Sequence, residues 1–434
     1  MRPGAAGAWT RSGKTAALVA CLLIAACGTQ PAPTPAPSST ARTASASPRD
    51  VEPSPGLSSS SSSNPSRPLA PGTHCGANPA LGGPAVGPAP SPTGRGNPPI
   101  WAARAATVPI AVVVASPDGQ LLAIAGAADT TGTAQLKAAG GVTVATLSDG
   151  AAATCLAWSP DGSLLAGSYR AGDVRLWDRT GQLVRTLHGA DPIFSLAWSP
   201  DGKVLATGGV HFPAPTAAGA PPIPGVVRLW SREGNLDRTL GTQMTGGKFL
   251  NLAWSPDGSM LAAGAVDYTV WRADGIQVGV PRTGGSPAWA MAWSPDGRTL
   301  AIGDENGILQ IGAPDGTTQS YSTFTGGVDA VRYSPDGVSL AVGHGSNVSV
   351  VNAADGRTIL WSTAALAAYA LWSADGREVL ISAADGLALV GPGGTPAATL
   401  SGCPGVVRAF SWDGAVVVAA TDSGWLCGWL VTPD

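Results

Sequence analysis

A motif of about 40 residues recurs along most of the chain, and it constrains the fold more than any other feature of the sequence. Its most regular part reads Ser-Pro-Asp-Gly or a close variant, usually directly after an aromatic residue. The aspartate of the motif occurs eight times, at Asp118, Asp161, Asp201, Asp257, Asp296, Asp336, Asp375 and Asp413. A period near 40 residues is typical of four-stranded sheets repeated around a common axis.

Each copy can be read as four strands joined by turns, and the second copy shows this most clearly. A first strand is predicted over 154–158, and the Ser-Pro-Asp-Gly turn at 159–162 follows it. In such a turn proline presets φ, aspartate bonds to its own backbone, and glycine takes the left-handed conformation. Further strands are predicted at 164–168, 174–178 and 182–187. Eight such copies predict an all-β fold, an eight-bladed β-propeller over residues 98–434; seven blades and a stray hairpin are the alternative.

The last copy contains residues for only three strands, 406–410, 416–420 and 425–430. A sheet that ends there would leave an unpaired edge, which invites pairing with other chains. We therefore predict that Ile100-Trp101-Ala102-Ala103-Arg104 supplies the fourth strand of this blade and closes the ring.

The N-terminus has the organisation of an export signal. Basic residues precede an apolar stretch at 16–26, which is too short to span a bilayer as a helix. The stretch ends in Leu-Ile-Ala-Ala followed by Cys27, which resembles the lipobox of bacterial lipoproteins. The resemblance implies that residues 1–26 are a signal peptide and that Cys27 is lipidated, which would anchor the protein on the extracytoplasmic face of the cell membrane. A plain secretory signal with an unmodified cysteine is the alternative.

Residues 27–97 consist mostly of Pro, Ser, Thr, Ala and Gly, and include an unbroken serine run at 58–63. Such a segment cannot bury enough apolar surface to offset the loss of chain entropy. We expect a disordered tether between the anchor and the ring.

The repeats resemble those of bacterial WD-repeat proteins. The resemblance is carried by Leu-Ala-Trp-Ser-Pro-Asp-Gly at 156–162 and by Val-Arg-Leu-Trp-Asp at 174–178. It implies a propeller that binds protein or peptide partners. The Gly-His pair of such repeats is missing and appears only reversed, as His188-Gly189 before the third copy. In the second copy Ala171 stands where the turn aspartate is expected, and Asp173 lies two places later. The buried polar network of the family is therefore expected to be mostly absent. The tryptophans recur at fixed places, which predicts packing between blades rather than a sugar-stacking surface.

Composition argues against several function classes. Only 12% of residues are charged, the net charge is −3 and no basic block occurs, so a nucleic-acid partner is not expected. The sequence contains no histidine pair with metal-ligand spacing, and the repeated aspartates are explained by turn geometry. No cofactor, metal or enzymatic activity is predicted. His188, His211 and His344 lie near predicted turns, where we expect them to be solvated.

Four cysteines would remain in the exported protein besides Cys27, in a compartment where disulfides form. Cys403 and Cys427 share the last blade and could pair with each other. A bond between Cys75 and Cys403, which would pin the tether to the ring, is the alternative. Cys155 lies within an inner strand and is expected to be a buried free thiol.

The third copy carries a long, proline-rich insertion at 209–225, between its second and third strands. By WD-repeat topology this loop lies on the face of the connections between blades, where such rings commonly bind partners. Candidate partner-binding residues on this face are Asp191, His211, Phe212, Ile223, Lys248, Trp289 and Asp329.

The leading hypothesis is a membrane-anchored, extracytoplasmic WD-repeat scaffold that mediates protein–protein interaction. The alternatives are a propeller-type hydrolase or lyase, and an envelope protein that binds a solute or a glycan. An enzyme would need an acid, a base and an electrophile converging at the channel mouth. The loops assigned to that face are mostly Gly, Ala, Thr and Pro, which favours binding over catalysis.

Overall fold

The computed structural model describes residues 72–73 and, with gaps, 98–431. The gaps lie at 107–109, 127–133, 139, 148–152, 170, 190, 212–223, 246–250, 265–267, 280–285, 287, 318, 366–368, 384–385 and 413–415. The signal peptide, Cys27 and nearly all of the tether lie outside the described residues.

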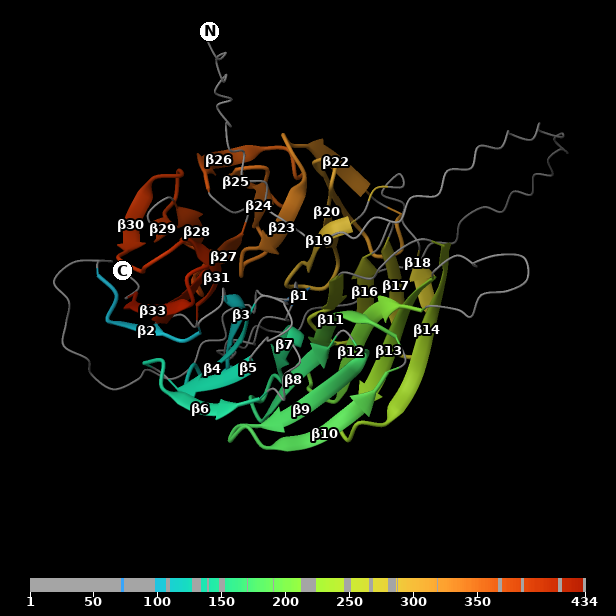
Figure 1. Ribbon diagram of the computed structural model, residues 1–434. Helices are drawn as coiled ribbons and strands as arrows, with labels where there is room; N and C mark the ends of the chain where they lie inside the picture. Colours follow the sequence, from blue (N-terminus) through green and yellow to red (C-terminus); the bar gives the residue numbers. More distant parts are fainter. Residues whose placement is uncertain are drawn as a thin grey trace, which may run out of the picture. The chain divides into compact units, whose positions relative to one another are not determined.

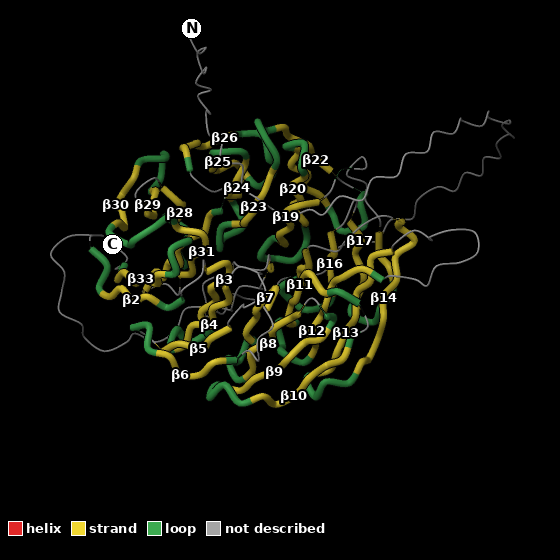
Figure 2. The backbone as a smooth tube through the Cα atoms, in the orientation of Figure 1, coloured by secondary structure: helices red, strands yellow, loops and turns green. Residues whose placement is uncertain are grey.

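The described residues form eight antiparallel sheets arranged as a ring, and the prediction of an eight-bladed propeller is confirmed (Figure 1). Strands and turns account for all of the described secondary structure (Figure 2). Blades 1 to 4 comprise β3 (Ile110–Ala115), β4 (Leu121–Gly126), β5 (Ala134–Ala138) and β6 (Thr143–Thr146); β7 (Ala153–Trp158), β8 (Leu164–Tyr169), β9 (Asp173–Asp178) and β10 (Leu183–His188); β11 (Ile193–Trp198), β12 (Val204–Val210), β13 (Pro224–Ser231) and β14 (Leu236–Thr245); and β15 (Asn251–Trp254), β16 (Met260–Gly264), β17 (Tyr268–Arg272) and β18 (Gln277–Gly279).

Blades 5 to 8 repeat the pattern. They comprise β19 (Ala288–Trp293), β20 (Leu300–Asp304), β21 (Ile308–Gly312) and β22 (Gln319–Thr323); β23 (Val328–Tyr333), β24 (Ser339–His344), β25 (Asn347–Asn352) and β26 (Ile359–Ala364); β27 (Ala370–Trp372), β28 (Val379–Ala383), β29 (Gly386–Val390) and β30 (Pro396–Ser401); and β31 (Val407–Trp412), β32 (Val416–Thr421), β33 (Trp425–Leu430) and β2 (Trp101–Arg104). The first strand of each blade lies nearest the centre of the ring (Figure 1). The short strand β1 (Gly72–Thr73) pairs with β15, the first strand of blade 4.

The turn between the first two strands of each blade forms as the sequence predicts. In the seven described copies the glycine of the motif has φ between 66° and 75°, the left-handed region that a side chain would strain. In the second copy Ser159 Oγ donates to Asp161 Oδ1 at 2.6 Å, and the Leu164 amide donates to Ser159 Oγ at 3.0 Å. The aspartates of these turns are thus engaged in local backbone geometry.

Tryptophans join neighbouring blades, as predicted from their fixed place in the repeat. The indole Nε1 of Trp198 donates to the carbonyl of Ala157 in the preceding blade at 3.2 Å, and that of Trp293 donates to Ala253 at 2.9 Å. These rings are buried between sheets, so each blade supplies part of its neighbour's core.

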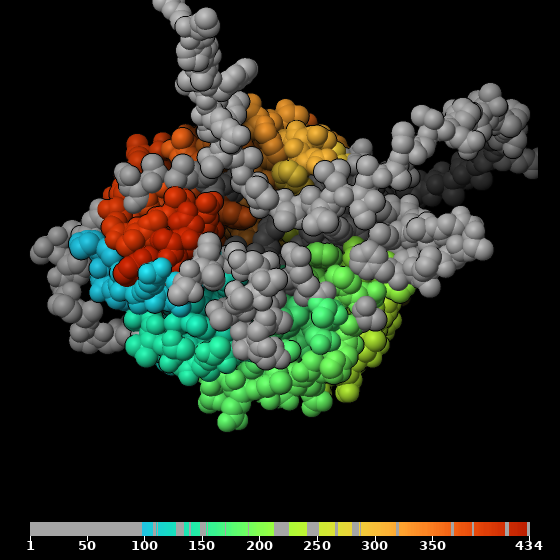
Figure 3. All heavy atoms as spheres, viewed as in Figure 1, coloured from blue at the N-terminus to red at the C-terminus, as the bar shows by residue number. Residues whose placement is uncertain are grey.

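The strand at the start of the ring closes the last blade. Trp101 and Arg104 of β2 stand opposite Gly428 and Trp425 of β33. The Ile100 amide extends the pairing by donating to the Gly428 carbonyl at 2.8 Å. The surface of residues 98–104, blue to cyan in Figure 3, accordingly lies against the red surface of the last blade.

The last copy departs from the sequence-based reading of its first turn. β31 continues through Ser411 to Trp412, which pairs with Val417 as Trp158 pairs with Leu165 in blade 2. Trp412, rather than Phe410, therefore ends the first strand of this blade, and its spacing to the paired residue of the second strand is two residues shorter than in blade 2. Alignment of the repeats on the Asp-Gly pair alone ends this strand two residues too early.

The structure gives the pairing state of three cysteines, Cys155, Cys403 and Cys427. Cys403 and Cys427 form a disulfide, with Cα atoms 5.8 Å apart, so the alternative pairing of Cys403 with Cys75 is not formed. Cys155 is buried in β7 but is disulfide-bonded, and the expectation of a free thiol is wrong. Its partner lies outside the described residues. Sequence periodicity places Cys155 in a strand but cannot bring a distant cysteine next to it.

Candidate functional site

The two faces of the ring carry different elements. The first strand of every blade begins at one face and ends at the Ser-Pro-Asp-Gly turn on the other. In an antiparallel sheet the loop between the second and third strands lies on the side where the first strand begins. The end of β12 and the start of β13, between which the insertion stands in the sequence, therefore lie on that side, which we call the insertion face; the opposite side is the turn face.

A β-bulge recurs at the insertion-face end of the first strand in six blades. In each case the second residue of the strand is skipped in the pairing with the next strand. The six skipped residues are Ala111, Thr154, Phe194, Trp289, Asp329 and Arg408. A bulge inserts one extra residue into a strand and bends the strand locally. These six residues, which we call the bulge ring, surround the centre of the propeller at the insertion face.

Several members of the bulge ring have side chains suited to binding. Phe194, Trp289 and Asp329 are partly buried, and Arg408 is exposed with its guanidinium 3.4 Å from Asp422. Burial raises the pKa of the Asp329 carboxyl. A Cβ added at Gly327 would lie 2.7 Å from the Trp289 ring, so the glycine provides the room in which this indole packs. The bulge ring thus combines aromatic and charged side chains on the strands of the propeller.

Trp289 and Asp329 are predicted from the sequence, and the structure places them at equivalent positions of blades 5 and 6, whereas Phe194 and Arg408 are not among the predicted residues. Their spacing in the repeat could have identified them. Each member of the bulge ring stands four residues before the end of the first strand, as Phe194 does before Trp198 and Arg408 before Trp412.

Asp191 joins the root of the insertion to the ring. Its side chain is buried just before β11, accepts a hydrogen bond from the Arg228 guanidinium on β13, and lies 3.0 Å from Nδ1 of His211. Burial by itself would raise the pKa of Asp191, but the bonds to Arg228 and His211 outweigh it and lower the pKa. Asp191 is therefore occupied within the protein and holds the loop ends, whereas the His211 side chain is half exposed.

Three of the predicted partner-binding residues cannot be placed, because Phe212, Ile223 and Lys248 lie outside the described residues. His188 is exposed as expected, but His344 is buried at the end of β24, where Nε2 lies 2.8 Å from Ser349 Oγ and Nδ1 lies 3.2 Å from the Thr325 carbonyl. The expectation that His344 is solvated is wrong. The residue ends β24 beside a turn, but its ring packs 4.6 Å from the Phe324 ring and bonds to Ser349.

The described residues contain neither a metal-binding cluster nor a membrane-spanning helix. No group of three or more His, Cys, Asp or Glu side chains in this part of the chain is arranged to hold a metal ion. Nor does a helix in the same residues have the length and apolar character needed to cross a membrane.

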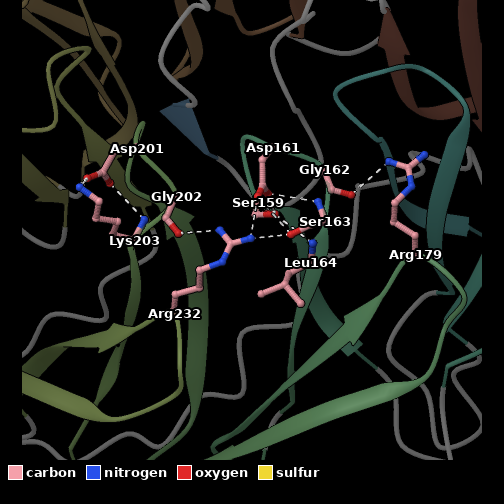
Figure 4. A network of polar contacts seen from close by, with 10 residues as sticks. All are labelled: Ser159, Asp161, Gly162, Ser163, Leu164, Arg179, Asp201, Gly202, Lys203 and Arg232. Atoms are coloured by element: carbon pink, nitrogen blue, oxygen red, sulfur yellow. Dashed lines mark hydrogen bonds and ion pairs between the residues drawn. The ribbon is translucent and has the colours of Figure 1, made fainter.

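The turn face carries ion pairs between blades (Figure 4). The Arg232 guanidinium in blade 3 donates to Asp161 Oδ2 of blade 2 at 2.6 Å and to the Gly202 carbonyl of its own blade at 3.0 Å. Arg179 in blade 2 bonds to Asp118 of blade 1 and to the Gly162 carbonyl in the same way. We call an arginine in this arrangement a junction arginine.

Comparisons with known proteins agree with this architecture. Residues 115–199 match the model of the anaphase-promoting complex subunit 4 WD40 domain, and residues 237–271 and 281–311 match that of the WD domain, G-beta repeat. Among curated protein sequences, none matches this one.

Solved structures with the same fold include two at low sequence identity. The computationally designed Ika8 protein is 18% identical with a TM-score of 0.62, and the match covers 77% of this chain and 99% of that one. Sqt1 of Saccharomyces cerevisiae is 15% identical with a TM-score of 0.64, covering 78% of this chain and 100% of that one. Segments of the chain thus resemble WD40 repeats, and its described part folds as an eight-bladed β-propeller.

Proposed function

We propose that this protein is a membrane-anchored, extracytoplasmic scaffold that binds protein partners through its insertion face. The bulge ring is the observation that carries the binding part of the proposal. It presents an aromatic pair, Phe194 and Trp289, together with Asp329 and Arg408, on strands held rigidly by the blades. Aromatic residues and arginine dominate the binding energy of protein interfaces, and preorganised side chains lose less entropy on binding.

The location rests on the N-terminal features together with the disulfide. An apolar stretch that ends at Cys27 resembles a lipoprotein signal, and two acyl chains on this cysteine would hold the protein at the membrane. The Cys403–Cys427 disulfide is of the kind that persists in oxidising compartments. A long segment rich in Pro and Ser between Cys27 and β2 would allow the ring to reach partners away from the bilayer surface.

The binding part predicts that Trp289→Ala weakens cross-linking of partners at least tenfold, which corresponds to about 1.4 kcal/mol. The measurement is quantitative cross-linking in cell envelopes, in which a photoreactive group at position 194 is compared with one at the exposed turn-face residue Gln120 of blade 1. Removal of residues 212–223, with β12 and β13 joined after His211, tests the insertion separately. Gln120→Ala is the matched control. If the same proteins are cross-linked with equal yield from both faces, the insertion face is not the binding surface.

The anchoring part predicts that Cys27→Ala moves the protein from the membrane pellet to the soluble fraction after cell disruption. Loss of the diacylglyceryl group removes the burial of two acyl chains, worth about 0.8 kcal/mol per CH₂. Intact-mass measurement of the wild-type protein should show the acyl groups on a mature chain that begins at Cys27. A mature chain that begins elsewhere or carries no lipid would contradict this part and leave the binding part untouched.

A further inference from the structure

The junctions between blades at the turn face repeat one geometry. The glycine of each Ser-Pro-Asp-Gly turn lies against the proline of the preceding blade's turn. A Cβ added at Gly162 would lie 3.2 Å from Cδ of Pro117, and one added at Gly337 would lie 3.3 Å from Cδ of Pro295. The junction of blades 1 and 2 can therefore be compared directly with that of blades 5 and 6.

At two junctions this geometry binds the guanidinium of a junction arginine. In both cases the guanidinium donates to the turn aspartate of the preceding blade and to the turn-glycine carbonyl of its own blade. A carboxylate and a backbone carbonyl held at fixed positions can both accept hydrogen bonds from one planar guanidinium. Two blades thus provide an occupied version of the site within the same molecule.

At the junction of blades 5 and 6 the arginine is replaced by Ala353. The equivalence follows from the backbone: the Arg232 amide donates to the Lys203 carbonyl at 2.8 Å, and the Ala353 amide donates to the corresponding Val338 carbonyl at 2.9 Å. Both acceptors remain, as Asp296 and the Gly337 carbonyl. The Asp296 carboxylate has Arg298 Nε at a distance of 3.9 Å, and the Arg298 side chain is 85% exposed.

A pocket of about 980 Å³ lies at this junction, and Asp296, Gly337 and Ala353 are among its lining residues. Tyr333 also lines it, in a position held by tryptophan in six other blades, and its hydroxyl lies 3.0 Å from Thr299 Oγ1. The alanine at 353 leaves open the space that the junction arginines fill between blades 1 and 2 and between blades 2 and 3. An aromatic ring beside a carboxylate favours a guanidinium.

The junction of blades 3 and 4 also lacks the arginine, with Ala273 in its place. There the acceptor, Asp201, is paired with Lys203 Nζ at 3.3 Å. The junction of blades 5 and 6 differs because the basic group next to its carboxylate, Arg298, is farther away at 3.9 Å and lies on a largely exposed side chain.

We propose that the pocket between blades 5 and 6 binds an arginine side chain of a protein partner, with Asp296 and the Gly337 carbonyl as acceptors. The partner's guanidinium would take the place that Arg179 and Arg232 fill in their junctions. The inference concerns the turn face, and it depends on the proposed function only in taking the partner to be a protein.

The test uses the full mature protein and two short peptides, acetyl-Gly-Arg-Gly-amide and the same peptide with citrulline, which keeps the shape of arginine but has no charge. Binding is measured by NMR titration at fixed ionic strength. We expect the arginine peptide to bind at least tenfold more tightly than the citrulline peptide. Asp296→Asn and Ala353→Arg should each weaken arginine-peptide binding at least tenfold, the first by removing the charge and the second by filling the pocket from within.

Ala273→Arg is the matched control, because it places an arginine at the other alanine junction and should leave peptide binding unchanged. Ala353→Arg should also raise the melting temperature, which shows that the variant folds. Equal binding of the two peptides, no measurable binding, or unchanged binding to Ala353→Arg would each overturn the proposal. The insertion-face proposal is tested separately, since Trp289→Ala should keep arginine-peptide binding intact.

Discussion

Deletion of residues 98–106 should lower the free energy of unfolding by about 5 kcal/mol or more, and the melting temperature by about 10 °C. The deletion removes β2, which completes the last blade, and with it the hydrogen bonds to β33. It also removes Trp101 and Ala105, which pack in the core between blade 8 and blade 1. The free edge of β33 should in addition promote association of chains.

Point variants separate the contribution of packing from that of the strand. Trp101→Ala should cost about 2 kcal/mol, because the half-buried indole fills space against Gly428. Gly428→Val should be comparably damaging, since a Cβ at this position would lie 2.4 Å from the Trp101 ring. Ile100→Ala is the control: its side chain is 49% exposed, and little change is expected. Thermal unfolding of the deletion variant at the wild-type temperature would contradict closure of the ring by β2.

The sequence was informative where structure is set locally. Pro, Asp and Gly in the turns fix φ and hydrogen bonding within four residues, so the number of blades could be predicted from the repeat. Closure by Trp101–Arg104 followed from counting strands, because a blade short of one strand needs a partner from elsewhere. In the last copy the same local reasoning misplaced the strand, since the shortened turn before Val416 becomes visible only in the pairing of Trp412 with Val417.

The candidate site depended on longer-range geometry. Bulges arise from pairing between strands, so neither Phe194 nor Arg408 stands out in a linear reading. The contact between Asp191 and Arg228 joins residues 37 positions apart and requires the register of β11, β12 and β13 to be known. Chemistry that recurs once per blade can be predicted from the repeat, whereas interactions unique to one blade cannot.

Replacement of Asp191 by alanine should lower the free energy of unfolding by about 3–5 kcal/mol at neutral pH. Asp191 is 3% exposed, and its removal leaves the mostly buried Arg228 guanidinium without its acceptor. The loss should also loosen the root of the insertion, because His211 depends on the same carboxylate. Chemical denaturation followed by tryptophan fluorescence measures the difference.

The dependence of this loss on pH tests its electrostatic origin. The pKa of Asp191 is lower in the folded protein than its ordinary value of 3.8, so its contribution is complete above that value and declines as pH falls through the folded pKa. The difference between wild type and Asp191→Ala should therefore be constant from about pH 5 to 7 and shrink below about pH 4. Asp173, whose partner His188 is largely exposed at 3.2 Å, provides the matched pair at the surface, and Asp173→Ala should cost less than about 1 kcal/mol. Equal losses for the two variants would mean that burial of the Asp191 ion pair does not determine its contribution to stability.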